Sequence, residues 1–155
     1  MPGAEILLVE DDEVLCDIIG RNLRARGHSV SVAPNVQSAL ASLRAHDFDL
    51  VILDINLPDQ TGWEVLRLAQ HEGTLHLREL DGNKLPVVVL SAVQVSPRRL
   101  AEFRPLAYLP KPFPLDSLLR LAAEAAERRN GGVVTEQEDE EHASTVLPDE
   151  EELHA

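Results

Sequence analysis

Four short apolar stretches of this 155-residue chain are each followed by polar or ionisable side chains. In chain order these side chains are Glu10 and Asp11 after residues 6–9, Asp54 after residues 50–53, Ser91 after residues 87–90, and Lys111 just beyond residues 106–109. If the three carboxylates came within about 4 Å of one another, each pair would repel by ~1 kcal/mol in water and ~4 kcal/mol at an effective dielectric of about 20. A fold that keeps such a cluster needs a partner that offsets the repulsion.

A hard divalent cation is the natural partner. Mg²⁺ takes oxygen ligands from carboxylates, a backbone carbonyl and waters, and it leaves room for a phosphate oxygen. Lys111 and Ser91 would then offer a cation and a hydrogen-bond donor to an anion at the metal, as phosphoryl transfer requires. In that chemistry a carboxylate such as Asp54 can be the nucleophile and become an acyl phosphate.

Each acid also has a simpler interpretation when it is considered alone. Glu10, Asp11 and Asp12 could cap a following helix, whose dipole favours negative charge at its start. Asp54 could be an ordinary loop acid. These interpretations fail for the set as a whole, because they leave the clustered charge without an offset.

The chain between these positions alternates between strand and helix patterns. The unbroken apolar runs at residues 6–9, 50–53 and 87–90 are typical of strands buried on two faces, as parallel strands are. Residues 29–32 alternate and predict a half-exposed edge strand, and residues 106–109 predict a weak strand. Five helices are predicted from apolar side chains at helical spacing. They are Val14, Leu15, Ile18, Ile19 and Leu23; Val36, Ala39, Leu40 and Leu43; Trp63, Val65, Leu66 and Ala69; a short stretch at 98–103; and Leu115, Leu118, Leu119, Ala122, Ala125 and Ala126.

Five strands alternating with five helices predict a doubly wound α/β fold, with a five-stranded parallel sheet and helices on both faces. The edge character of the second strand favours the flavodoxin-like order 2-1-3-4-5. In that order the first and third strands are neighbours, and ligands bind beyond the carboxyl ends of the strands. The fold would therefore gather the five side chains at one end of the sheet.

Charge and composition limit the partners. The net charge is −13, and residues 131–155 hold nine acidic and no basic residues, which leaves 18 acidic and 14 basic residues, or −4, for residues 1–130. We expect one folded domain over residues 1–130 and an acidic disordered tail over residues 131–155, either a solvating tail or a short partner motif. Direct binding to nucleic acid or to a membrane is not expected of such a chain. The single Cys16, interpreted as a buried small hydrophobe, and the lack of a long apolar run make the cytoplasm the default location.

Four segments resemble the receiver domain of two-component response regulators. They are residues 6–12 (ILLVEDD), residues 54–58 (DINLP) with Gly62, residues 86–92 (PVVVLSA) and residues 108–113 (YLPKPF). The resemblance covers residues 5 to about 128, in the order of the family. It implies a stand-alone regulator that takes a phosphoryl group from a sensor histidine kinase or phosphotransfer protein and signals to a downstream protein. Such a protein catalyses only its own phosphorylation and dephosphorylation.

The resemblance also implies a role for each site residue. Asp54 would be the phosphoacceptor. The Mg²⁺ ligands would be Glu10 through water, Asp11, Asp54 and the backbone carbonyl of Asn56. Ser91 and Lys111 would contact phosphoryl oxygens. The resemblance implies three further features: Tyr108 as the aromatic switch, a cis peptide bond at Lys111-Pro112, and the side chains of Asn56 and Val93 as positions that tune hydrolysis.

Two regions depart from the family pattern. The separation of 37 positions between Asp54 and Ser91 is longer than usual, and the surplus at residues 71–84 forms either a small hairpin or a plain loop. We interpret His71 and His76 there as surface residues rather than metal ligands. Residues 104–107 replace the usual turn of the family, which predicts a short or irregular fourth helix.

Two other functions stay open at this point. The chain could be a binding module that keeps the receiver fold and works without phosphorylation. A hydrolase that uses an aspartyl phosphate is a third possibility, but it would need a second acid two residues after the nucleophile, where Asn56 stands.

Overall fold

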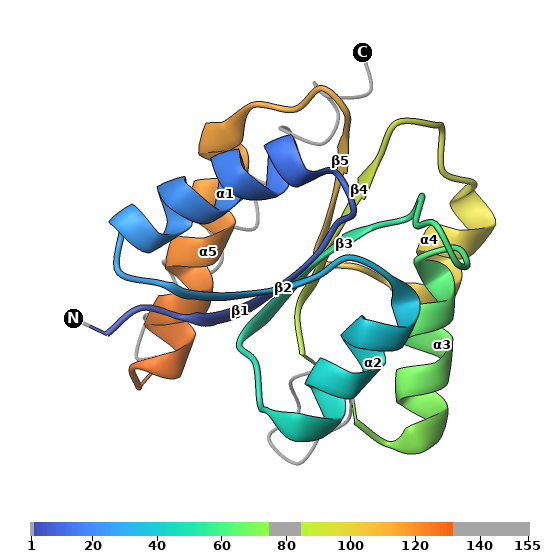
Figure 1. The fold of residues 1–155 in the computed structure, drawn as a ribbon, viewed down its shortest axis with the longest axis horizontal. Helices are drawn as coiled ribbons and strands as arrows, with labels where there is room; N and C mark the ends of the chain where they lie inside the picture. The colour runs from blue at the N-terminus through green and yellow to red at the C-terminus, as the bar shows by residue number, and fades with distance from the viewer. Residues whose placement is uncertain (1, 75–84, 132–155) are drawn as a thin grey trace.

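Five parallel strands form one sheet in the order β2-β1-β3-β4-β5, as the sequence predicts. The computed structural model describes residues 2–74 and 85–131 of the chain (Figure 1). The strands are β1 (Glu5–Val9), β2 (Ser29–Ala33), β3 (Leu50–Asp54), β4 (Val87–Ser91) and β5 (Ala107–Pro110). The helices are α1 (Glu13–Ala25), α2 (Val36–Ala45), α3 (Trp63–Glu72), α4 (Pro97–Phe103) and α5 (Leu115–Arg129).

Helices cover both faces of the sheet, with α1 and α5 on one side and α2, α3 and α4 on the other (Figure 1). Successive strand side chains point to opposite faces. Leu7 and Leu53 therefore pack in the cluster under α2 and α3, whereas Leu8 and Ile52 pack in the cluster under α1 and α5. Two separate cores explain why the runs at residues 6–9, 50–53 and 87–90 are apolar at every position.

The strand at the edge of the sheet is β2, where Ser29 and Ser31 are exposed and Val32 is 43% exposed. Helix α1 departs from its predicted pattern. Val14 and Ile18 were expected on its buried face, but they are 69% and 45% exposed. They lie four residues apart and form an exposed stripe beside the buried face of α1. The apolar face of this helix is therefore wider than the part that the sheet and α5 cover. The same helix holds Cys16, which is half-buried rather than buried.

Helix α4 is short, as predicted, with seven residues. Ser96 caps its start by accepting a hydrogen bond from the backbone N–H of Arg99, and Arg104 ends it with a left-handed backbone at φ 47°. Phe103 at its end stacks on Trp63 at the start of α3, with ring centroids 5.2 Å apart. The predicted cis bond at Lys111-Pro112 is also present.

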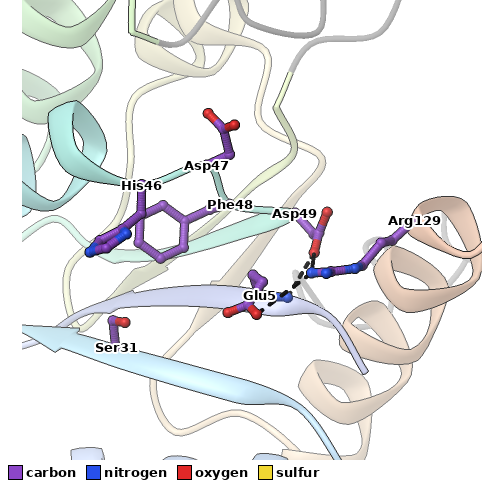
Figure 2. A pocket seen from close by; sticks show the side chains of 7 residues that line it. All are labelled: Glu5, Ser31, His46, Asp47, Phe48, Asp49 and Arg129. Carbon is purple, nitrogen blue, oxygen red and sulfur yellow. Dashed lines mark hydrogen bonds and ion pairs between the residues drawn. The ribbon is translucent and has the colours of Figure 1, made fainter. Parts of the chain in front are cut away.

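A polar pocket lies at the amino-terminal end of the sheet, opposite the end where the strands finish (Figure 2). It is lined by Glu5, Ser31, His46, Asp47, Phe48, Asp49 and Arg129. The guanidinium of Arg129 lies 3.0 Å from the carboxylate of Asp49 and 3.7 Å from that of Glu5. Asp49 also accepts a hydrogen bond of 2.7 Å from the backbone N–H of Glu5. These charges fasten the last turn of α5 to the start of β1.

The remaining predictions concern the ends and the long connection. The possible hairpin at residues 75–84, His76 and the acidic tail after residue 131 lie outside the described residues. His71 is exposed in the last turn of α3. Within the described ranges, the helices include none with the length and apolar character needed to cross a bilayer.

Candidate functional site

Three carboxylates meet where β1 and β3 end side by side. Glu10, Asp11 and Asp54 each offer an oxygen within 4.8 Å of the others, which makes them a possible cation site. Asp54 is the last residue of β3, and the backbone N–H of Glu10 extends the ladder to β2 by donating to the carbonyl of Ala33 at 3.0 Å. The strands therefore set the positions of both buried acids, as the sequence predicts.

The acids differ in burial. Glu10 is 1% exposed and Asp54 is 2% exposed, whereas Asp11 is exposed. Lys111 reaches both buried acids: its Nζ lies 2.8 Å from Glu10 Oε1 and 3.1 Å from Asp54 Oδ2. Its backbone N–H donates to the carbonyl of Ser91 at 2.8 Å, which fixes the base of the lysine beside β4. The ammonium thus contacts two of the three clustered carboxylates.

Burial and the neighbouring charges shift the pKa values of Glu10 and Lys111. Burial, together with a hydrogen bond to Asp54, raises the pKa of Glu10 to about 7, although Lys111 and the backbone N–H of Asp12 act in the opposite direction. Burial acts to lower the pKa of Lys111, but its contacts with Glu10 and Asp54 outweigh burial and raise it. A cluster with one lysine and a partly protonated glutamate retains excess negative charge, which suits a hard divalent cation.

Only Asp12 of the acids at the end of β1 caps α1. Its carboxylate accepts hydrogen bonds from the backbone N–H groups of Val14 at 3.0 Å and Leu15 at 3.1 Å. The simpler interpretation of these acids therefore holds for Asp12, and it leaves Glu10 and Asp11 free of a capping role at α1.

Asn56 begins the loop that follows Asp54. Its backbone N–H donates to Asp54 Oδ1 at 2.9 Å, which ties the first residue of the loop to the carboxylate. Gly62 closes the loop with no room for a side chain, because a Cβ there would lie 2.3 Å from the carbonyl oxygen of Asp54. The spacing Asp54 to Gly62 in the sequence thus corresponds to a close backbone approach.

Ser91 and Tyr108 meet at a single carbonyl. The hydroxyl of Ser91 donates to the carbonyl of Val93 at 2.7 Å and accepts from the N–H of Val93 at 3.1 Å. The hydroxyl of Tyr108 donates to the same carbonyl at 3.3 Å. The sequence predicts both side chains, but it holds no signal for the shared acceptor, since a backbone carbonyl has no residue type.

Comparisons with known proteins show the family to which this chain is similar. A family model described as the response regulator receiver domain matches residues 6–123. The response regulator protein PmrA of Pseudomonas aeruginosa is 38% identical over 115 residues, which are 73% of this chain and 48% of that protein. The chain spans about half the length of the curated relatives it matches.

Solved structures with the same fold include two receiver domains. The non-phosphorylated HemR receiver domain from Leptospira biflexa is 33% identical with a TM-score of 0.62, and the match covers 77% of this chain and 90% of that one. The receiver domain of a sensor histidine kinase from Pseudomonas aeruginosa, with a magnesium ion coordinated in its active site cleft, is 29% identical with a TM-score of 0.62. That match covers 77% of this chain and 94% of the other.

Proposed function

The chain belongs to the response regulator receiver domain family, and from this premise we propose that Asp54 accepts a phosphoryl group from a phosphohistidine. The observation that supports this most is the placement of Asp54, buried at the end of β3 with Lys111 3.1 Å away and the acids of β1 beside it. An isolated structural aspartate would not need this set of neighbours. The chain is thus a signalling module whose own carboxylate is the acceptor.

The transfer breaks the N–P bond of the phosphohistidine and forms an O–P bond at the Asp54 carboxylate. The electron pair of the broken bond returns to the imidazole nitrogen of the donor. Lys111 pairs with a phosphoryl oxygen once the group arrives. Ser91 leaves the carbonyl of Val93 to donate to another phosphoryl oxygen, and Tyr108 then stays as the donor to that carbonyl. This exchange reports phosphorylation to the loop before α4 and to a downstream protein.

The cation site fits Mg²⁺. Glu10, Asp11, Asp54 and the carbonyl of Asn56 would hold it, consistent with their oxygen ligands and excess negative charge. A bound magnesium ion would neutralise charge on the phosphoryl oxygens during transfer. The receiver domain of the sensor histidine kinase, which holds magnesium in its cleft, supports this assignment.

Magnesium affinity should depend on pH through Glu10. Its pKa in the metal-free chain is raised to about 7, so a proton must leave before the carboxylate can assist a cation. We expect the affinity to rise about tenfold per pH unit below about pH 7 and to level off above it. Calorimetric titration of Mg²⁺ from pH 6 to 8 checks this. The variant Glu10→Gln should bind more weakly with a flat profile, and an equally steep profile in that variant would assign the proton to another group.

The raised pKa of Glu10 also determines how the unfolding free energy changes with pH. The pKa of Glu10 is raised from its ordinary value of 4.5, so the unfolded chain loses this proton at lower pH than the folded chain. The contribution of Glu10 to the unfolding free energy, without metal, is therefore present at low pH and is lost as pH rises from about 4.5 through about 7.

The exposed stripe of α1 is the surface we assign to the phosphodonor protein. Val14 and Ile18 are 69% and 45% exposed, and Val14 lies only three residues beyond Asp11. Because Asp11, just before α1, lies beside Asp54, a donor histidine that reaches Asp54 comes close to the start of α1. A helix of the donor can then cover this apolar stripe as it docks. Burying the stripe would contribute binding free energy without changing the chemistry at Asp54.

Replacing Ile18 with aspartate should separate docking from chemistry. We expect Ile18→Asp to slow transfer from a phosphohistidine protein about tenfold, because an apolar contact is replaced by a charge. Phosphorylation by acetyl phosphate should stay at the wild-type rate. The matched control, Ala101→Asp, adds the same charge on the exposed side of α4 and should slow neither reaction. Equal slowing with both donors would place the defect in the site itself.

The function as a whole is tested by incubating the chain with acetyl phosphate and Mg²⁺ and measuring its intact mass. We expect a fraction with one added phosphoryl group, and no such fraction when Mg²⁺ is chelated before acetyl phosphate is added. A chain that never gains this group would be a binding module with a receiver fold.

A further inference from the structure

The loop that follows Asp54 is closed at its base. Asn56 and Thr61 form an antiparallel bridge, and the N–H of Gly62 donates to the carbonyl of Ile55 at 2.7 Å. These contacts hold the two ends of residues 56–61 together beside Asp54. They do not fix how the rest of the loop is tilted about that base.

Asp59 fixes the far side of this loop to another element. Its Oδ1 accepts a hydrogen bond of 3.0 Å from the backbone N–H of Val36, and its Oδ2 accepts one of 3.3 Å from that of Gln37. These are the first two backbone donors of α2, which have no partner inside the helix. The hydrogen bond from Val36 lowers the pKa of Asp59 below its usual range, as expected for a contact that favours the charged carboxylate.

Helix α2 has its own cap and does not depend on Asp59 to begin. Asn35 Oδ1 accepts from the N–H of Ser38 at 2.7 Å, and Ser38 Oγ accepts from the N–H of Asn35 at 3.3 Å. This reciprocal pair is a capping box. The bonds of Asp59 are therefore additional to those that start the helix, and their other end is the loop.

We infer that Asp59 is a positioning residue for the magnesium site, because it ties the loop that carries the Asn56 carbonyl to the start of α2. The inference rests on the proposed function, in which that carbonyl is a ligand. With the base of the loop fixed at Asn56 and Thr61 and its far side fixed at α2, the carbonyl has one orientation. The Asn56 carbonyl belongs to the peptide unit that leads from the base into the loop. Without Asp59 the base remains closed, but the direction of this peptide unit, and with it the ligand oxygen, is no longer fixed before the ion binds.

The test compares two caps of the same helix in the full chain. Asp59→Ala removes the tie to the loop, and Asn35→Ala removes the helix's own cap. Both should lower the Tm, since each leaves N-terminal backbone donors unpaired. We expect Asp59→Ala alone to raise the Mg²⁺ dissociation constant, measured by calorimetry, by about tenfold. The variant Asp59→Asn, which keeps one carbonyl acceptor for α2, should weaken binding by less.

Each outcome decides the inference. Weaker Mg²⁺ binding in Asp59→Ala with unchanged binding in Asn35→Ala supports it, whereas equal affinities in both, changed or unchanged, overturn it. If Asp59→Ala does not fold, Asp59→Asn decides: weaker binding supports the inference and unchanged binding overturns it. A wild-type chain that does not bind Mg²⁺ overturns the proposed function and the inference together. If the wild-type chain binds Mg²⁺ and the Asp59 variants bind it equally well, the inference alone is overturned.

Discussion

Asp54→Asn is expected to abolish phosphorylation and at the same time to stabilise the fold. The amide has no nucleophilic carboxylate oxygen, so no acyl phosphate can form. The substitution also removes one of the two buried charges that share Lys111, and the new amide can donate to Glu10. We expect the unfolding free energy at pH 8 without metal to rise by about 1 kcal/mol.

Intact mass after acetyl phosphate treatment and urea unfolding check these two effects. Loss of phosphorylation together with a gain in stability is informative, because a misfolded variant would lose both phosphorylation and stability. Phosphorylation that persists in Asp54→Asn would place the acceptor elsewhere. A loss of stability would mean that the carboxylate is held mainly for structural reasons.

Lys111→Met is expected to damage both properties. The lysine is the cation that contacts both Glu10 and Asp54, and its side chain is 22% exposed. Without it, two buried carboxylates face each other without an offset, which costs about 2 kcal/mol once partial exposure is allowed for. The loss of the group that pairs with the phosphoryl oxygen should slow phosphorylation by acetyl phosphate about 100-fold. Methionine replaces the lysine side chain as far as Cε and lacks only the ammonium group, so packing changes little.

A double-mutant cycle measures how much of the stabilisation by Lys111 comes from its contact with Asp54. In the background of Asp54→Asn only one buried carboxylate is left for the lysine, so Lys111→Met should cost about 1 kcal/mol less than in the wild-type chain. Equal costs in the two backgrounds would contradict the shared contact. Urea unfolding of the four chains at pH 8 without metal supplies the comparison.

The sequence predicts the fold well because its strands carry an unusually plain signal. Leu7 and Leu8 are buried on opposite faces, so the run at β1 is apolar throughout, and the polar residue that follows marks where the strand ends. Parallel strands then bring those ends together. Glu10, Asp11 and Asp54 are close in space for this reason alone, before any resemblance is considered.

Other features depend on contacts that a local pattern does not record. Val14 and Ile18 belong to an apolar stripe that looks continuous in sequence, but how much of a helix is covered depends on the element packed beside it. Asp59 has its α2 partners 22 and 23 residues earlier in the chain, and nothing near it in sequence indicates them. The shared carbonyl of Val93 belongs to this group as well. The structure thus adds two things: the polar contacts between residues far apart in the sequence, and the extent to which each helix is covered by its neighbours.

The most direct test of the central claim is to locate the phosphoryl group in the wild-type chain. After incubation with acetyl phosphate and Mg²⁺, borohydride reduces an aspartyl phosphate to homoserine, which peptide mass spectrometry assigns to a single position. The predicted result is homoserine at position 54 and at no other aspartate. Reduction at a different acid, or none in a chain shown to bind Mg²⁺, would contradict the assignment of Asp54 as the phosphoacceptor.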